Sequence, residues 1–231
     1  VLGGVTNTLN LGFTDGDPDG VLVPINDTLK IVPWDKKVLQ VLISMRSYQE
    51  KWGVIKKPAE VDPRNILKKI IKKFDGTGLK PVVAIELEFY LLDKKRNKEG
   101  KPVPAKGVSK TNVYGIPDLD IFGRLFDEIN ENCKKQGIPA TTASSEFAAG
   151  QYEINLKHTE NLLKAADDAA LLRRIIKETS AKHGYEATFM AKPFLDETGS
   201  GMHLHVSVYD QKGKNIFASP NRYGNSKLKN A

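Results

Sequence analysis

The chain has 231 residues, of which 40% are apolar and 27% are charged, an ordinary composition for a globular protein with a sizeable core. Its net charge is +7, but the basic residues are mostly lysines scattered along the chain, so nucleic-acid binding is not indicated. No apolar run approaches the ~18 residues of a membrane span, and no signal-peptide pattern is present. We therefore expect a cytoplasmic protein with no membrane partner.

Cys133 is the only cysteine, which excludes a disulfide within the chain and a thiolate cluster for zinc. Oxygen and nitrogen atoms would therefore have to hold any metal. The chain begins at Val1 and ends in LKNA without a helix stop or a turn signal. We expect it to be a piece of a longer chain.

The first 45 or so residues predict a small β-rich unit. Turn-forming residues gather at 16–20, and β-branched residues predict short strands at 21–23 and 28–32. A first helix is expected to begin at Asp62-Pro63. Aspartate can cap a helix, and proline at the first helical position lacks only a donor that would be unpaired anyway.

The rest of the chain mixes helical and strand patterns. Two further helices are predicted at 118–136 and 159–183, each followed by a glycine. The predicted strands are 82–92, 139–146, 150–157, 186–191 and 202–210. The second and third of these are joined too closely for a helical crossover, so we expect them to be antiparallel. Together these elements predict an α+β fold.

Three of the predicted strands alternate an apolar face with a face of carboxylates, amides or imidazoles. Residues at i and i+2 lie on the same side of a strand, so Glu86 and Glu88 share one face and lie opposite an apolar row. The polar positions of the other two strands are Gln151, Glu153 and Asn155, and His203, His205 and Ser207. If the apolar rows share one core, the polar rows line one surface.

This polar surface predicts a divalent metal site. Lysine, the commonest charged residue of the chain, occupies none of its positions. Carboxylates gathered on one surface repel one another and are costly to desolvate unless a cation compensates them. Glu146 adds another carboxylate just ahead of the strand at 150–157. Oxygen ligands favour Mg²⁺ or Mn²⁺, which bind phosphate oxygens and stabilise phosphoryl transfer.

Three segments resemble, in this order, the catalytic-domain motifs of the glutamine synthetase family, and especially its γ-glutamylpolyamine (putrescine) synthetase branch: VVAIELEFYLLD, EFAAGQYEINLKH and ATFMAKPFLDETGSGMHLHVSVYD. The resemblance extends through nearly the whole chain. It implies a remnant of a small N-terminal β-grasp-like domain with a linker at 1–60, followed at 61–231 by the N-terminal portion of the catalytic domain. In that domain helices back a curved, largely antiparallel sheet.

The resemblance also implies roles for individual residues. Glu88, Glu146 and Glu153 would hold one metal ion, and Glu86 and His203 would belong to a second. His205 and Ser207 would bind on the ATP side, Gly199 would approach the substrate glutamate, and Tyr114 would lie near the amine pocket. Glu146 would also be catalytic, because it would help to receive the acceptor amine.

The implied reaction has two steps. The γ-phosphate of ATP is transferred to the γ-carboxylate of glutamate, and an amine (a polyamine-type amine or ammonia) then attacks the acyl phosphate. The implied partners are glutamate, ATP, the amine and further copies of the chain, arranged in rings with the active site at the subunit junction. The arginines that would stabilise phosphate and glutamate are not among these residues, so we expect the 231-residue segment alone to be inactive.

Three functions remain open at this level. Ammonia-using members carry Asn-Gly-Ser-Gly before the first histidine, whereas this chain has Thr198 in place of the asparagine, which favours the polyamine-like branch. The same departure would also suit a catalytically inactive, metal-binding or scaffolding relative. A nucleic-acid binder would have to use the basic run at 94–110, although the prolines and glycines of that run are typical of a solvated loop.

Overall fold

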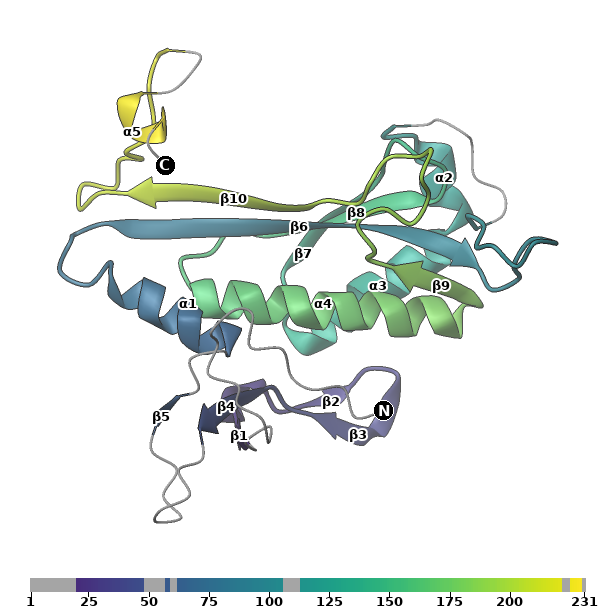
Figure 1. The fold of residues 1–231 in the computed structure, drawn as a ribbon, viewed down its shortest axis with the longest axis horizontal. Coiled ribbons are helices and arrows are strands. Elements are labelled where there is room, and N and C mark those ends of the chain that lie inside the picture. Colours follow the sequence, from purple (N-terminus) through teal and green to yellow (C-terminus); the bar gives the residue numbers. More distant parts are fainter. Residues whose placement is uncertain (1–19, 48–56, 59–61, 106–112, 222–224, 230–231) are drawn as a thin grey trace, which may run out of the picture. The chain divides into compact units, whose positions relative to one another are not determined.

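The structure of the chain, a computed structural model, describes residues 20–47, 57–58, 62–105, 113–221 and 225–229 (Figure 1). Two compact units are present. The first comprises Val1–Ile31 and Lys37–Thr77, and the second comprises Val32–Lys36 and Gly78–Ala231. The expected division of the chain at residue 60 stays a prediction.

Short strands and one helix form most of the described part of the first unit. An antiparallel sheet has the order β1 (Gly20–Pro24), β4 (Ile43–Ser47) and β5 (Lys57–Pro58). β2 (Lys30–Val32) pairs with β3 (Asp35–Gln40), and the residues at their junction, Val32–Lys36, are assigned to the second unit. The predicted strand at 28–32 is wrong at its start, because Asn26–Thr28 form a 3-10 turn, η1. In that turn the Thr28 hydroxyl donates to the carbonyl of Ile25 (2.7 Å). The turn predicted at 16–20 falls almost wholly outside the described residues.

The first α-helix begins where its capping signal predicts. α1 (Pro63–Lys72) follows Asp62, whose side chain accepts a hydrogen bond from the backbone N–H of Arg64 (2.9 Å). The other carboxylate oxygen of Asp62 accepts from the Ser44 hydroxyl (2.6 Å) and from the backbone N–H of Met45 (2.8 Å). One side chain therefore caps the helix and also joins it to β4.

The second unit is built on a five-stranded sheet in which every pairing is antiparallel. The strand order is β10 (Met202–Tyr209), β6 (Lys80–Asp93), β8 (Gln151–Leu156) and β7 (Ala140–Ser145), and β9 (Tyr185–Thr188) pairs with the far end of β6. The predicted strand at 186–191 is therefore wrong beyond 188, where the Thr188 hydroxyl accepts from the backbone N–H of Met190 (3.2 Å). The other four predicted strands lie within two residues of the observed bounds. The α+β class is confirmed.

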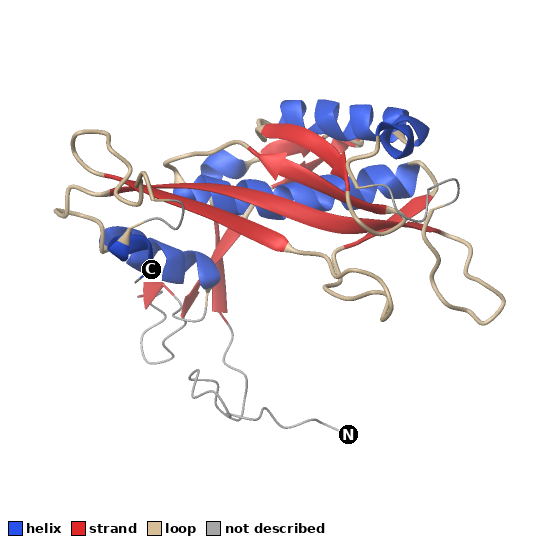
Figure 2. Cartoon of the chain, turned by 90° about the horizontal axis from the view of Figure 1, so that it is seen from above, coloured by secondary structure: helices blue, strands red, loops and turns tan. Residues whose placement is uncertain are grey.

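Helices cover one face of this sheet. α4 (Leu162–Lys182) runs along the sheet, and α3 (Gly123–Gln136) packs beside it (Figures 1 and 2). α4 begins three residues later than predicted, because the Asn161 side chain caps the backbone N–H of Lys164 (3.0 Å). A four-residue helix, α5 (Ser226–Lys229), ends the described chain. Within the described ranges, no helix has the length and apolarity to cross a bilayer.

The helix predicted at 118–136 is wrong as a single element. It is two helices, α2 (Ile116–Ile121) and α3, because Phe122 between them departs from helical geometry with φ −106° and ψ 18°. The Phe122 ring is buried and stands edge-on against Tyr152 and Tyr185, with centroids 5.8 and 5.3 Å away. This tertiary packing breaks the helix at a position where the local pattern continues.

The core lies between the sheet and helices α3 and α4. The apolar row of β6 is buried, as expected: Val83, Ile85, Leu87, Phe89 and Leu91. On the helices it meets Leu125, Ile129, Leu172, Ile175 and Ile176, each at most 1% exposed. These residues form one contiguous cluster with Tyr152 and Ile154 of β8.

The apolar row of β10 does not share this core, so the condition that all three apolar rows share one core is not met. Met202, Leu204 and Val206 are 66%, 58% and 47% exposed, and only Val208 is buried. β10 is an edge strand, and α4 packs on β6 and β9 rather than beneath it. The helix layer is narrower than the sheet.

Two leucines on the same face test this description. Leu87→Ala should lower the free energy of unfolding by about 2–5 kcal/mol, because it opens a cavity at a residue that is 2% exposed. Leu204→Ala makes the same change at an exposed site and should cost less than about 1 kcal/mol. Urea unfolding of both variants measures the difference. Equal losses would contradict the exposed placement of the β10 row.

Candidate metal centre

The strand register brings the polar rows together on one surface. His203 of β10 lies directly opposite Glu86 of β6, and Asn155 of β8 lies opposite Glu86 on the other side. One step along β6, Glu88 lies opposite Glu153. Directly paired residues have neighbouring side chains on one face, so the predicted shared surface is confirmed. It is the face that points away from the apolar core.

His203 is at the centre of a cluster of carboxylates. Its Nδ1 atom is 3.2 Å from Glu86 Oε2 and 3.8 Å from Glu153 Oε2. Its Nε2 atom is 3.6 Å from Glu88 Oε1. One ligand atom each from Glu86, Glu153 and His203 lie within 4.8 Å of one another, a separation that a single cation could bridge.

Glu146 belongs to the same electrostatic cluster. Burial raises the pKa of its carboxyl to about 7, and the negative charges of Glu153 and Glu88 act in the same direction. Burial also raises the pKa of Glu153, assisted by the charge of Glu86. Negative charge on buried and partly buried carboxylates, together with an imidazole, is the donor set that a hard divalent cation would satisfy. The residues present therefore fit Mg²⁺ or Mn²⁺.

Glu86 differs from its neighbours because two imidazoles approach it. Burial alone would raise the pKa of its carboxyl, but the hydrogen bonds and charges of His205 and His203 outweigh burial and hold the pKa below its usual value. His205 Nε2 lies 2.9 Å from Glu86 Oε1. His205 is therefore joined to the cluster through Glu86.

The remaining predicted site residues lie around this cluster rather than in it. Ser207 is on the same face of β10 but four residues, roughly 13 Å, beyond His203. Gly199 precedes β10, and its carbonyl accepts from the Gln151 amide (3.0 Å). Tyr114 is 70% exposed with φ 56°, and its backbone N–H donates to Ser145, next to Glu146. The roles expected for these residues stay predictions.

Gly201 is a residue of this site that the sequence pattern did not single out. Its backbone N–H donates to Glu88 Oε2 (3.0 Å), and its carbonyl accepts from the backbone N–H of Glu88 (3.1 Å). A Cβ atom there would lie 2.6 Å from His203 Nε2 and 3.0 Å from Glu88 Oε1. In the sequence, the only indication of this role was a glycine two positions before His203. Its contacts with Glu88 and His203 appear only in the folded turn.

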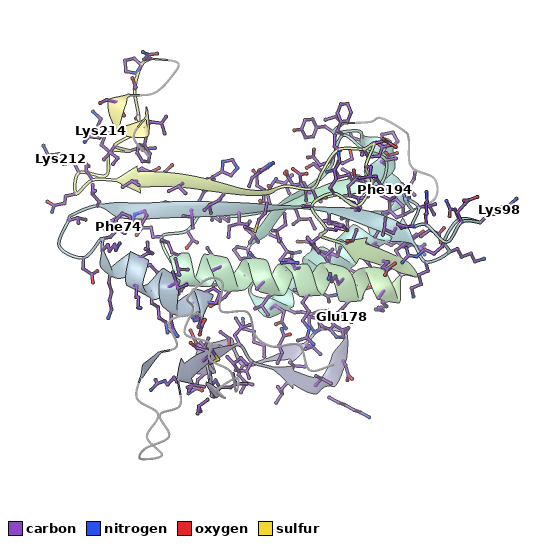
Figure 3. The ribbon with its side chains drawn as sticks, viewed as in Figure 1. Phe74, Lys98, Glu178, Phe194, Lys212 and Lys214 are labelled. Atoms are coloured by element: carbon purple, nitrogen blue, oxygen red, sulfur yellow. The ribbon has the colours of Figure 1, made fainter. Side chains whose placement is uncertain are left out.

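The basic run lies at the far end of β6 from β10. Its described part follows β6, where Arg96 pairs with Glu186 (2.5 Å) and Lys94 Nζ donates to the carbonyl of Ala181 (3.1 Å). Lys98 projects from the tip of this hairpin (Figure 3). These contacts join the described part of the hairpin to α4 and β9.

Fold and cluster together define the class of this protein: an α+β domain with a carboxylate–imidazole cluster on the face of an antiparallel sheet opposite its helices. Comparison with known proteins identifies the family. The model of the glutamine synthetase catalytic domain matches residues 60–231. The chain belongs to the glutamine synthetase family.

Relatives extend the comparison over nearly the whole chain. γ-Glutamylputrescine synthetase PuuA of Escherichia coli K12 is 40% identical over 225 residues, which are 94% of this chain and 46% of that protein. Glutamate–isopropylamine ligase of a Pseudomonas species is 37% identical over 220 residues, 92% of this chain and 46% of that protein. The chain thus spans about half the length of these relatives.

A solved structure shows the same fold. The chain resembles a GmaS/ADP complex with a TM-score of 0.77 at 25% sequence identity, over 97% of this chain and 50% of that one. The expectation of a partial catalytic domain of this family, containing an antiparallel sheet backed by helices, is confirmed.

The raised pKa of Glu146 predicts how stability depends on pH without metal. The pKa of Glu146 is about 7 in the folded state and 4.5 in the unfolded state. Its contribution to stability is therefore fully present below the unfolded pKa and is lost as pH rises through the folded pKa. The melting temperature in chelator, relative to that of Glu146→Gln, should therefore fall between pH 5 and pH 8. Mg²⁺ should restore it most strongly at pH 8. A difference between the two proteins that is constant across this range would contradict the raised pKa of Glu146.

Gly201→Ala tests the close approach of the turn to the cluster. The added methyl group would displace the His203 ring, because that ring end is half-exposed and can move more easily than the backbone. We expect weaker Mn²⁺ binding by isothermal titration, with a melting temperature close to that of the parent. Gly123→Ala, where a Cβ atom would meet nothing within 4 Å and the backbone is helical, controls for the change of residue type. Unchanged Mn²⁺ affinity in Gly201→Ala would argue against this geometry.

Proposed function

We propose that the full-length protein is an ATP-dependent ligase that joins glutamate to an amine through γ-glutamyl phosphate. The observation that carries the proposal is the position of His203 among Glu86, Glu88 and Glu153 on one sheet face. Membership of the glutamine synthetase family supports it, as do the relatives named for ligation of putrescine or isopropylamine.

In the proposed reaction, the cluster would hold the divalent cations that phosphoryl transfer needs. Phosphoryl transfer breaks the bond between the β- and γ-phosphates of ATP and forms one to the glutamate γ-carboxylate, which releases ADP. The amine nitrogen then attacks the acyl carbon, phosphate leaves, and the nitrogen loses a proton. Mg²⁺ or Mn²⁺, when bound, supplies positive charge for the transferring phosphoryl group.

The residues of the chain would divide this work. In the proposed arrangement Glu88, Glu146 and Glu153 hold one ion, and Glu86 and His203 serve the second. His205 and Ser207 extend along β10 toward ATP, and the backbone at Gly199 contacts the substrate glutamate. Glu146, which directly follows β7, would attract the amine and accept its proton. Tyr114 lies beside that strand end, where it would border the amine.

We propose an alkylamine rather than ammonia as the preferred acceptor. By the resemblance to the family, Thr198 stands where ammonia-using members carry an asparagine. Its hydroxyl donates a hydrogen bond to Gln151 Oε1 (2.6 Å). The two relatives named for substituted amines support the same choice. We further propose homo-oligomeric rings with the active site at a subunit junction, in the cytoplasm, by analogy with the family.

ADP release by the full-length protein tests this function. With glutamate, Mg²⁺ or Mn²⁺ and a panel of putrescine, isopropylamine and ammonia, we expect the highest kcat/KM with an alkylamine. His203→Ala and Glu153→Gln should each lower turnover by more than the ~10–100-fold that loss of a supporting residue costs. Glu186→Gln, which removes an exposed carboxylate paired with Arg96, is the matched control and should retain activity.

Two other outcomes would replace the proposal. Mn²⁺ binding without turnover on any amine would identify a non-catalytic member of the family. Equal turnover in the parent and in His203→Ala would remove the cluster from the mechanism.

A further inference from the structure

A buried amide joins three parts of the site. Gln151, the first residue of β8, is 2% exposed. Its Nε2 atom donates to Glu88 Oε2 (2.9 Å) and to the carbonyl of Gly199 (3.0 Å). Its Oε1 atom accepts from the Thr198 hydroxyl (2.6 Å) and from the backbone N–H of Ala148 (3.3 Å). Both donors and both acceptor positions of the amide are therefore used.

The orientation of this amide is set by its backbone partners. The N–H of Ala148 can only donate, and the carbonyl of Gly199 can only accept. A flipped amide would set its oxygen against the Gly199 carbonyl and its nitrogen against the Ala148 N–H, which would leave both pairs repulsive. The Nε2 atom of Gln151 must therefore face Glu88, and the Glu88 carboxylate accepts a hydrogen bond from it.

Thr198 fixes the opposite side of the amide and is itself held in place. Its carbonyl accepts from the Tyr90 hydroxyl (2.5 Å). Tyr90 has no exposed surface, and its ring packs edge-on against Phe194 with centroids 5.2 Å apart. Figure 3 shows Phe194 in the loop between β9 and β10. The loop that carries Thr198 is thereby anchored on β6.

The two oxygens of Glu88 face different surroundings. Oε2 accepts from Gln151 and from the backbone N–H of Gly201. Oε1 is 3.6 Å from His203 Nε2, on the side of the cluster. The protein thus holds one oxygen with two donors and presents the other to the site.

We propose that Gln151, with its amide fixed by Thr198, is a positioning residue that orients Glu88 toward the metal centre and couples it to the turn at 198–201. This inference rests on the proposed function, because it takes Glu88 as a metal ligand and the turn as the contact for glutamate. Loss of the amide should therefore weaken both metal and glutamate binding, whereas a residue that served only stability would change neither.

The test compares Mn²⁺ dissociation constants in the full-length protein, measured by isothermal titration at constant pH. Gln151→Met keeps the approximate size of the side chain and removes all four hydrogen bonds, and Thr198→Val removes only the hydroxyl. We expect Mn²⁺ binding about 10–100-fold weaker in Gln151→Met, with a smaller loss in Thr198→Val. Thr198→Ser, which keeps the hydroxyl, should recover the parent affinity. The KM for glutamate should rise along with the Mn²⁺ dissociation constant.

The chain offers a matched control away from the site. Asn132 of α3 donates from its amide to the Thr179 hydroxyl of α4 (3.1 Å), and both residues are buried. Thr179→Val removes the same kind of buried bond and should lower the melting temperature without changing Mn²⁺ affinity.

The results distinguish failure of the positioning role of Gln151 from failure of the ligase proposal. Parent-like Mn²⁺ affinity in folded Gln151→Met and Thr198→Val would overturn the positioning role and leave the ligase proposal standing. If Gln151→Met does not fold, Thr198→Val and its serine counterpart decide by the same criterion. Absence of Mn²⁺ binding in the parent protein would overturn both proposals.

Discussion

The candidate metal centre depends on a concentration of negative charge on one face of an antiparallel sheet. Glu86, Glu88 and Glu153 approach one histidine ring within 3.2 to 3.8 Å. Burial raises the pKa of Glu146 to about 7, and the negative charges of Glu153 and Glu88 act in the same direction. A sheet can carry such a cluster because its other face supplies apolar burial, which stabilises the strands that hold the carboxylates.

β6 contributes to both faces of the sheet. Its odd-numbered residues from Val83 to Leu91 build the core, and Glu86 and Glu88 on the other face belong to the cluster. β10 contributes its two histidines from an edge position, so it gains little from the helix layer. The loop before it is instead secured by hydrogen bonds with Tyr90, Gln151 and Glu88, and by the packing of Phe194 on the Tyr90 ring.

The sequence predicted the faces because the two-residue period of a strand is local: Glu86 and Glu88 share a side whatever the partner strand. It could not predict that His203 lies opposite Glu86, since register depends on the folded turns. Nor could it predict the break at Phe122, which arises from contact with Tyr152 and Tyr185. The exposure of Leu204 follows from the width of the helix layer, and the bonds of Gln151 follow from tertiary placement. The roles assigned by resemblance came from motifs, not from these geometric constraints.

Anomalous diffraction at the manganese edge from crystals of the full-length protein tests the central claim most directly. With Mn²⁺ present, the account predicts a peak at bonding distance from side chains of the group Glu86, Glu153 and His203. Manganese peaks confined to other parts of the molecule, or none at all at saturating Mn²⁺, would contradict the assignment of this sheet face as a metal centre.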